Sequence, residues 1–422
     1  MDDVTRRKSD KNPSEDIPSP LPGAEPEAAD YVVSHLEEAI EKGWIRVFYQ
    51  PLIRSISGEL CGMEALARWD DPERGLLPPA VFIPPLEKKQ KIWKLDLCVI
   101  RQAVEELAGR KSSGKPMIPV SINLSRSDFL CCDIFREIED IVRRNGVDRS
   151  LIHIEMTESA VNPDAEAEFK TLDRFKEAGY ELWMDDFGRG CSSLNLLKEY
   201  AFDVLKLDME FLRRETKRSR FIVQSIIRMN KGIGHQVLSE GVENREQVEF
   251  LRKSGCDMLQ GYYFGCPMPL EKMLDCCAAR GIAIESRKQR ACWSALRNID
   301  FLMDVPLALL ICENKTFRLP FVSDRAMDLL GEDTTREELE KWINDPQDTA
   351  GAELFRAVES AIRTGGSGEI CCSRGDRELL IHCRCIGRFD ETYLFAVELR
   401  DCSMPGRGKY RRGGDAGERT EK

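Results

Sequence analysis

The sequence is poor in histidine, has no long apolar run and lacks the cysteine spacing of zinc sites. Its four histidines, His35, His153, His235 and His382, leave imidazole-based zinc centres and Ser-His-Asp triads hard to assemble. The 16 cysteines are scattered and form no C-x-x-C motif, which indicates free thiols and small buried side chains. Any bound metal would therefore need oxygen ligands, which favours magnesium, manganese or calcium.

Membrane and nucleic-acid functions also find little support. No stretch approaches the roughly 18 consecutive apolar residues of a spanning helix, and the N-terminus has no apolar signal core. A net charge of −11 argues against a general nucleic-acid-binding surface. We therefore expect a cytoplasmic protein without a membrane span and without a nucleic acid polymer as partner.

The composition divides the chain into four parts. Residues 1–30 are polar and proline-rich, and residues 403–422 are basic and glycine-rich, so both are expected to be disordered tails. Between them we expect a barrel domain over residues 31–285 and a smaller α+β domain over residues 292–402. From the short N-terminal tail we expect no further domain before the barrel.

Eight strand candidates, most of them separated by helices, follow one another in the barrel region. They cover residues 45–53, 60–69, 118–123, 152–158, 181–186, 204–208, 236–241 and 258–262. This alternation is typical of a parallel sheet, and eight such units predict a (β/α)8 TIM-type barrel. The step from the first strand to the second is too short for a helix, which leaves an antiparallel first pair open.

Polar side chains lie at or near the end of almost every strand candidate. They are Gln50, Glu64, Asn123, Glu155, Asp185, Asp186, Lys206, Glu240 and Gln260. One acid of this kind is often only a solvated loop residue or a helix cap. Many strands delivering such groups to one rim indicate an active site at the C-terminal mouth of the barrel.

The residues of this rim suit hard divalent cations. Carboxylate and amide oxygens could hold two ions about 4 Å apart, which would clamp the oxygens of an in-line phosphoryl displacement. Lys206 could take a proton from water, and Arg68 could present a planar fork to a phosphate. This chemistry favours phosphodiester hydrolysis, although a ring of acids with a lysine also suits metal-assisted enolisation.

Several motifs together resemble one family. Glu64-Ala65-Leu66-Ala67-Arg68-Trp69, with Tyr49-Gln50-Pro51 before it, resembles the signature of the EAL family of cyclic di-GMP phosphodiesterases. Its other motifs follow in order: Ser121 to Ser125, Ile154 to Ser159, Asp185-Asp186-Phe187-Gly188, Lys206-Leu207-Asp208, Glu240 to Glu243 and Gln260-Gly261-Tyr262. The resemblance covers roughly residues 31–285 and implies hydrolysis of cyclic di-GMP to linear pGpG.

The resemblance also implies roles for individual residues. The metal ligands for two magnesium or manganese ions would be Glu64, Asn123, Glu155, Asp185, Asp186 and Glu240. Lys206 would assist deprotonation of the attacking water. The catalytic residues would be Lys206, Glu64, Asp186 and Glu240. Gln50, Arg68 and Gln260 would hold the dinucleotide, and Gln260 would also support the metal site.

The loop after Asp186 is expected to couple the site to a homodimer contact in this family. Glu158 would fix that loop, and Glu243 would support the metal-site network. Arg189 and Cys191 depart from the small hydroxyl residue and the aromatic residue that the family usually has there. The alternative function is a catalytically silent cyclic di-GMP receptor that acts through a protein partner, which would be expected to have lost part of the acid ring.

The C-terminal part reads differently from the barrel. Strand candidates at residues 307–312 and 318–322, helices at 324–330 and 354–363, and strands at 368–372, 378–385 and 393–399 give an α+β order. This order weakly resembles a PAS-type sensory domain. We favour a structural, regulatory or dimerising role over ligand sensing, and ordinary packing over haem ligation for His382.

Overall fold

The computed structural model describes residues 25–157, 160, 166–187, 193–213, 216–294, 306–331, 334–345, 347, 349–364, 366–374, 377–389 and 391–402. The predicted C-terminal tail and most of the N-terminal tail lie outside these ranges, as do Glu158, Arg189 and Cys191. Helix α1 (Glu25–Glu41) begins inside the predicted N-terminal tail.

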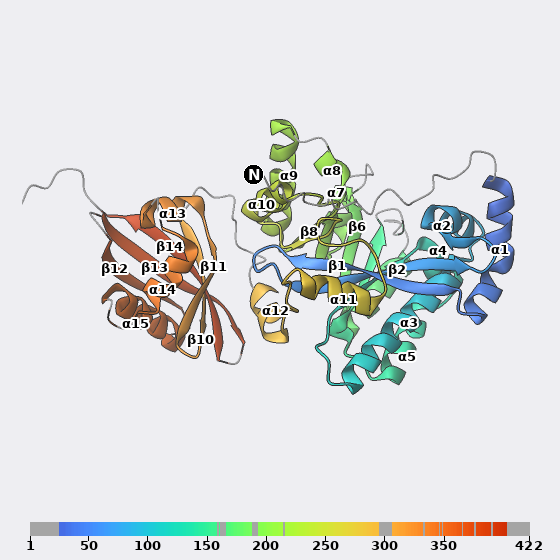
Figure 1. The fold of residues 1–422 in the computed structure, drawn as a ribbon, viewed down its shortest axis with the longest axis horizontal. Coiled ribbons are helices and arrows are strands. Elements are labelled where there is room, and N and C mark those ends of the chain that lie inside the picture. Colours follow the sequence, from blue (N-terminus) through green and yellow to red (C-terminus); the bar gives the residue numbers. More distant parts are fainter. Residues whose placement is uncertain are drawn as a thin grey trace, which may run out of the picture.

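Eight strands close into a barrel in which the first strand runs antiparallel to both of its neighbours (Figure 1). In spatial order they are β1 (Ile45–Arg54), β9 (Met258–Leu259), β8 (Gln236–Ser239), β7 (Val204–Leu207), β6 (Glu181–Phe187), β5 (Ile152–Thr157), β4 (Val120–Leu124) and β2 (Leu60–Asp71). Strand β2 pairs again with β1 and completes the ring, and the short β3 (Gly75–Leu77) continues the sheet beyond β2. The predicted barrel, with its antiparallel first strand, is confirmed.

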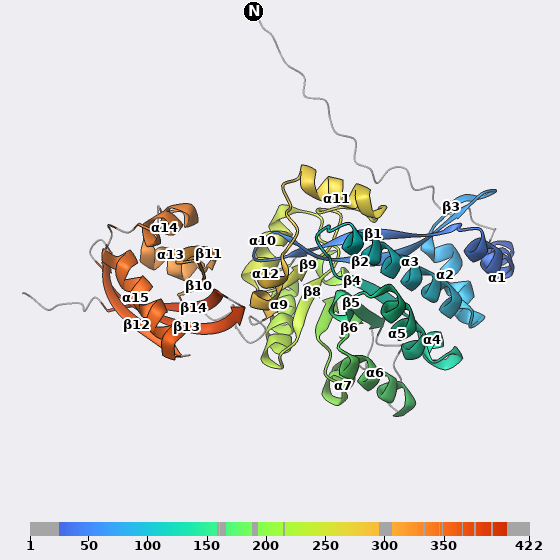
Figure 2. The same cartoon turned by 90° about the horizontal axis from the view of Figure 1, so that it is seen from below.

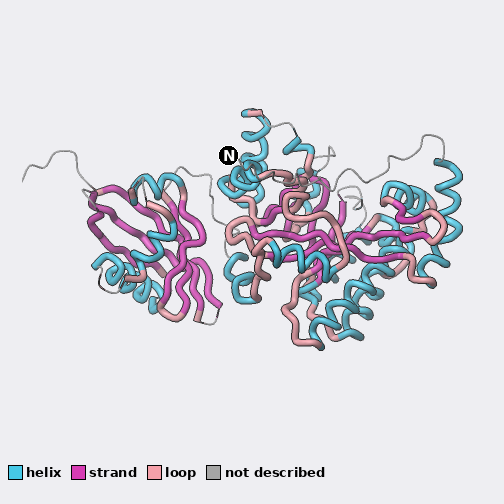
Figure 3. The backbone as a smooth tube through the Cα atoms, in the orientation of Figure 1, coloured by secondary structure: helices cyan, strands magenta, loops and turns pink. Residues whose placement is uncertain are grey.

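Helices surround the barrel, as the turned view and the tube show (Figures 2 and 3). After α1 they are α2 (Pro79–Lys88), α3 (Ile92–Ser112), α4 (Arg126–Cys131), α5 (Ile134–Asn145), α6 (Glu166–Ala178), α7 (Ser193–Glu199), α8 (Glu210–Arg213), α9 (Lys217–Gly232), α10 (Arg245–Lys253), α11 (Leu270–Ala279) and α12 (Arg287–Ser294). None of the described helices is both long and apolar enough to cross a membrane.

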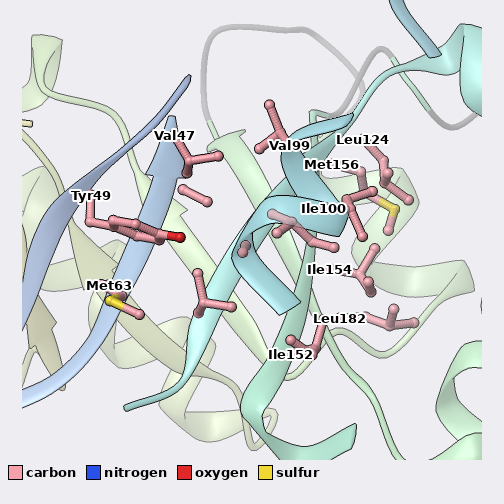
Figure 4. Packing of buried hydrophobic residues seen from close by; sticks show 14 of the residues in the cluster. Val47, Tyr49, Met63, Val99, Ile100, Leu124, Ile152, Ile154, Met156 and Leu182 are labelled. Carbon is pink, nitrogen blue, oxygen red and sulfur yellow. The ribbon is translucent and has the colours of Figure 1, made fainter. Parts of the chain in front are cut away.

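The parallel strands are buried on both faces, and β5 shows how the two faces differ. Ile152, Ile154 and Met156 form one face and pack in the large core cluster with side chains of neighbouring strands and helix α3 (Figure 4). His153 and Glu155 alternate with them and therefore point to the inside of the barrel. The apolar face stabilises the barrel wall, while the other face is left for the polar groups of the lumen.

Helix α2 has no counterpart among the predicted elements. Pro84 and Pro85 lie inside it, and each removes a backbone donor from the helical ladder. The helix forms because Pro79 suits its first turn and because Phe82 and Leu86 are fully buried against the barrel domain. Burial of these two side chains outweighs the unfavourable local preference.

The C-terminal domain is a five-stranded antiparallel sheet in the order β11-β10-β14-β13-β12, with helices against one face. The strands are β10 (Leu307–Glu313), β11 (Thr316–Val322), β12 (Ser367–Arg374), β13 (Arg377–Phe389) and β14 (Thr392–Asp401). The helices are α13 (Asp324–Leu330), α14 (Arg336–Ile343) and α15 (Thr349–Thr364). The expected α+β order is confirmed, and α14 is the one helix of this domain that the sequence pattern did not predict.

Helix α14 protects the outer edge of this sheet. Glu340 accepts a hydrogen bond from the backbone N–H of Leu319 at 2.7 Å. Asn344 accepts from the N–H of Phe317 and donates to its carbonyl, both at 2.8 Å. These side chains satisfy edge groups of β11 that would otherwise be available to pair with another chain.

Two acidic side chains contact each other between α3 and α4. Asp128 is completely buried, and its Oδ2 accepts hydrogen bonds from the N–H and hydroxyl of Ser125. Burial raises the pKa of Asp128 to about 6, and burial together with the charge of Asp128 raises the pKa of Asp96 well above its usual value. A proton shared between the two carboxyl groups favours the protonated form of Asp96.

We expect Asp96→Asn to stabilise the protein above pH 6 by about 1–3 kcal/mol. The folded protein binds protons more tightly than the unfolded chain at this pair, so its unfolding free energy falls as pH rises from about 4 through about 6. Asparagine keeps the donor and removes the second charge. Urea unfolding from pH 4 to 8 should therefore show a flatter profile in the variant, whereas parallel profiles would contradict a shared proton.

Candidate functional site

The polar side chains predicted at the strand ends, Asp186 apart, contact one another inside the barrel, and the strand register explains why. Asn123 of β4 lies beside Glu155 of β5, and Gln50 of β1 lies opposite Glu64 of β2. Lys206 belongs to β7, while Glu240 and Gln260 directly follow β8 and β9. Because the carboxyl ends of parallel strands share one rim, side chains from distant parts of the sequence reach the same place.

Lys206 is the centre of this arrangement. Its side chain is 1% exposed, and Nζ lies 2.6 Å from Glu240, 3.0 Å from Glu155, 3.2 Å from Asp185 and 3.6 Å from Glu64. Four carboxylates from four different segments thus surround one ammonium group. A buried carboxylate without such a partner would cost several kcal/mol, so these charges depend on one another.

One ammonium cannot balance four ionised carboxylates. Burial acts to lower the pKa of Lys206, but the surrounding carboxylates, Asp185 foremost, raise it well above its usual value. Burial raises the pKa of Glu155 above its usual value and that of Glu240 to about 7, although Lys206 opposes both shifts. With these groups alone, the site therefore holds a protonated lysine and more acidic groups than its single positive charge can balance.

Amide side chains orient the carboxylates. Gln260 donates to Glu64 at 2.6 Å and to Gln50 at 3.0 Å, and Asn123 donates to the other oxygen of Glu64 at 2.9 Å. Gln50 in turn donates to the carbonyl of Gly265 at 3.2 Å. The two amides at Gln50 and Gln260 thus connect β1, β2 and β9 at the level of the acids.

Asp185 and Asp186 lie at an irregularity where β6 ends. The pairing of β6 with β7 shifts between Met184 and Phe187, and Asp186 has a left-handed backbone with φ of 56°. Its N–H donates to Asp185 Oδ1 at 2.9 Å. This bulge breaks the simple alternation of the strand, which is the exit geometry needed for two neighbouring acids to serve one site.

A cavity of about 280 Å³ opens above these groups. Its lining comprises Gln50, Glu64, Leu66, Asp185, Lys206, Met209, Glu240, Gly241, Glu243, Gln260, Gly261 and Tyr262. Gly241 has φ of 67°, and a Cβ atom there would lie 2.3 Å from that of Met209, so only glycine fits this wall. A larger cavity, of about 920 Å³, is lined by residues that precede β4 and β5, by the first residue of β6 and by residues between 284 and 291, and contains none of the predicted site residues.

The remaining predicted residues occupy different places around the cavity. Arg68 donates to the carbonyl of Ala67, and its guanidinium lies 5.7 Å from the ring centre of Phe48, so it borders the acid cluster without binding it. Glu243 lines the cavity. Tyr262, 59% exposed at the mouth, was not predicted as a site residue, although its place directly after Gln260-Gly261 could have indicated it.

The donor set fits divalent cations, although the carboxylates turn toward Lys206. Within the described ranges, no three His, Cys, Asp or Glu side chains form a ready-made metal site. Oε1 of Glu155 and Oε1 of Gln260 are nevertheless buried without a hydrogen-bond donor. Buried acceptors of this kind, beside acids that lack positive charge, are the ligands that hard cations prefer.

Comparison with known proteins agrees with this geometry. The EAL domain family matches residues 33–267, more than half of the chain. This chain belongs to the EAL domain family. An uncharacterised signalling protein of Caulobacter vibrioides and the oxygen sensor protein DosP of Escherichia coli are each 35% identical over 240 residues, 56% of this chain, but the match covers 29% and 30% of those proteins. Cyclic di-GMP phosphodiesterase NbdA of Pseudomonas aeruginosa is 33% identical over 237 residues, 56% of this chain and 30% of that protein.

The EAL domain also matches solved structures. The PaMucR phosphodiesterase in complex with c-di-GMP is 31% identical with a TM-score of 0.54, and the match covers 58% of this chain and 99% of that chain. The EAL enzyme Bd1971, bound to cAMP and cyclic-di-GMP, is 28% identical with a TM-score of 0.55, covering 58% of this chain and 68% of that chain. The chain spans less than a third of the length of the curated relatives named above.

None of these matches supports the expected PAS-type resemblance of the C-terminal domain.

We expect Lys206→Met to lower the unfolding free energy in metal-free buffer at pH 8 by about 3–5 kcal/mol, because it leaves buried carboxylates without their cation. Lys231→Met serves as the comparison, since Lys231 is also buried but lies 2.9 Å from one carboxylate, that of Asp257. Urea unfolding monitored by circular dichroism measures both variants. Equal losses would show that the acid cluster adds nothing to an ordinary buried ion pair.

Proposed function

We propose that the chain is a metal-dependent phosphodiesterase that hydrolyses cyclic di-GMP to linear pGpG. The observation that carries this proposal is the ring of acids and amides around Lys206 at the carboxyl ends of the barrel strands. The likeness to the PaMucR phosphodiesterase, whose structure contains c-di-GMP, supports the same substrate. A pure interaction protein would have no use for this much buried charge.

The proposal assigns the ring two magnesium or manganese ions. Glu64, Asn123, Glu155 and Asp185 would hold one ion, and Asp185, Asp186 and Glu240 would hold the second. When bound, the ions supply positive charge that activates water and stabilises the phosphoryl oxygens. Their charge would also satisfy the buried Oε1 of Glu155, which accepts no hydrogen bond from the residues that the structure describes.

The other residues would bind substrate and move the proton. Arg68 is not itself a lining residue but interacts electrostatically with Glu64 and Tyr262 of the lining, and it could present two N–H groups to a phosphate there. Gln50 and Gln260 offer amide groups to the dinucleotide. With its neighbouring acids neutralised by bound ions, Lys206 Nζ, 3.2 Å from Asp185, would be able to lose its own proton and then assist in removing the proton of the attacking water. Glu243 would support this network from the cavity wall. Glu158, which the sequence predicts to fix the loop after Asp186, lies outside the described residues.

The rival is a receptor that binds cyclic di-GMP without cutting it. The feature that discriminates the enzyme from the receptor is the acid ring, and this chain has all of its acids together with the lysine. A receptor needs only groups that bind the dinucleotide, whereas the fully buried acid Glu155 and the partly buried Asp185 beside it cost free energy unless positive charge balances them. Completeness of the ring therefore favours the enzyme.

The deciding experiment is turnover of cyclic di-GMP by the purified chain with magnesium or manganese. We expect pGpG as the product, loss of activity on chelation with EDTA, and a fall of about 100-fold or more in kcat for both Glu64→Gln and Lys206→Ala. These substitutions remove a ligand or a proton-transfer group while leaving the apolar wall of the barrel intact.

Glu73→Gln is the matched control, because Glu73 is an exposed acid outside the cavity and its change should leave kcat within about twofold. Tight binding of cyclic di-GMP without any pGpG in either metal would overturn the enzyme and support the receptor. Turnover that survives in Glu64→Gln would refute the assigned site.

A further inference from the structure

We propose that the C-terminal domain positions the amides of Gln50 and Gln260 by clamping the β1 end of the barrel through helix α12. The inference rests on the proposed function, since these two side chains are assigned to the dinucleotide. It adds positioning residues that lie outside the site: Ile56, Trp293 and the Arg54–Glu285 pair. The contacts form a continuous route from the C-terminal sheet to the cavity.

The clamp begins where Trp293 of α12 inserts into the C-terminal domain. Its side chain is buried, 2% exposed, against the sheet face opposite α13–α15. The junction cluster consists of Trp293, Leu309, Ile311, Phe321, Leu394 and Ala396, with Ile56, Leu307 and Ile386 packed against it. Ile56 belongs to the turn between β1 and β2, so this cluster joins both domains. Figures 1 and 2 both show α12 on the side of the barrel that faces the C-terminal sheet.

Polar contacts fix the same turn to the segment around α12. Arg54, the last residue of β1, donates to Glu285 from Nε at 3.3 Å and from Nη2 at 3.2 Å, and both side chains are almost fully buried. Gln289 of α12 donates to Glu59 at 2.7 Å. The turn is therefore held at both of its ends and at its tip. A buried bidentate pair restricts orientation more strongly than an exposed ion pair does.

From this turn the route to the site is short. Arg54 and Ile53 pair with Met258 and Leu259 of β9, and the N–H of Ser55 donates to the carbonyl of Asp257 at 3.0 Å. Gln260 directly follows Leu259, the last residue of β9, and donates hydrogen bonds to Gln50 and to Glu64. A displacement of the turn would thus be transmitted along β1 to Gln50 and through β9 to Gln260.

The length of β9 makes this dependence strong. Strand β9 has only two residues, whereas β1 has ten and pairs with it directly. A two-residue strand has few hydrogen bonds of its own, so its position depends on its two neighbours, β1 on one side and β8 on the other, and a shift of β1 removes half of this support. The exposed Lys253–Asp324 contact between the domains contributes little to this restraint, because exposed ion pairs are weak. The junction cluster and the Arg54–Glu285 pair carry the coupling.

The test compares Trp293→Ala with Trp293→Phe in the full chain. We expect Trp293→Ala to raise the KM for cyclic di-GMP about fivefold or more and to lower kcat by a smaller factor, because both amides bind substrate, whereas Glu64 loses the support of Gln260 but keeps its contact with Asn123. Trp293→Phe retains an aromatic ring in the cluster and should restore most of the affinity. Ile56→Glu, which perturbs the same cluster from the barrel side, should reproduce the rise, and combining it with Trp293→Ala should add little.

Trp342→Ala is the matched control, because Trp342 packs with the helices on the other face of the same sheet. An equal rise in KM for this variant would assign the effect to general loosening of the C-terminal domain and would overturn the clamp. Unchanged KM in Trp293→Ala would overturn it as well.

A second readout is independent of activity. Hydrogen exchange of the amides in residues 50–56 and 257–260, measured without dinucleotide, should become faster in Trp293→Ala and not in Trp342→Ala. If the parent chain neither binds nor cuts cyclic di-GMP, the proposed function fails while this measurement still decides the clamp. Unchanged exchange in these residues would refute it.

Discussion

The barrel depends on the balance between one ammonium group and four carboxylates at its centre. Lys206 lies within 3.6 Å of Glu64, Glu155, Asp185 and Glu240, which come from four separate segments of the chain. None of these acids could remain ionised in the lumen alone, so each strand that delivers one depends on the others being in register. The strands of the barrel and the side chains of the site therefore come into register together. The excess of negative charge that remains after Lys206 is counted is what makes the site suited to additional cations.

Amide side chains fix the orientation of the carboxylates, which attraction to Lys206 alone would not fix. Gln260 and Asn123 donate to opposite oxygens of Glu64, which fixes the plane of its carboxylate without adding a second cation. Another ammonium in their place would neutralise the acids and remove the attraction for a metal ion. An apolar residue would leave the carboxylate oxygens unsatisfied. The combination of one lysine with several amides therefore gives orientation and net negative charge together.

The parts of this structure that could be predicted from sequence are those with a periodic or positional signal. Buried parallel strands produce short apolar runs, and polar groups at their ends, such as Asn123 and Glu155, must share a rim once the sheet is parallel. Helix α2 could not be predicted in this way, because Pro84 and Pro85 oppose it and burial of Phe82 and Leu86 is what stabilises it. The left-handed backbone of Asp186 and the contact between Ile56 and Trp293 leave no pattern in the sequence either, since tertiary packing alone determines them.

The reversed first strand gives this barrel a property that a uniformly parallel barrel lacks. Strand β1 enters from the side of the site, so the turn that follows it, at residues 55–59, lies at the end where β2 and the parallel strands begin. A strand that carries Gln50 at the level of the acids is thereby attached, within six residues, to Ile56 in the junction cluster. If the first strand were parallel to the others, the six residues after Gln50 would run into the loops at the mouth of the barrel. The antiparallel strand instead connects the mouth with the opposite end, which is where the C-terminal domain packs.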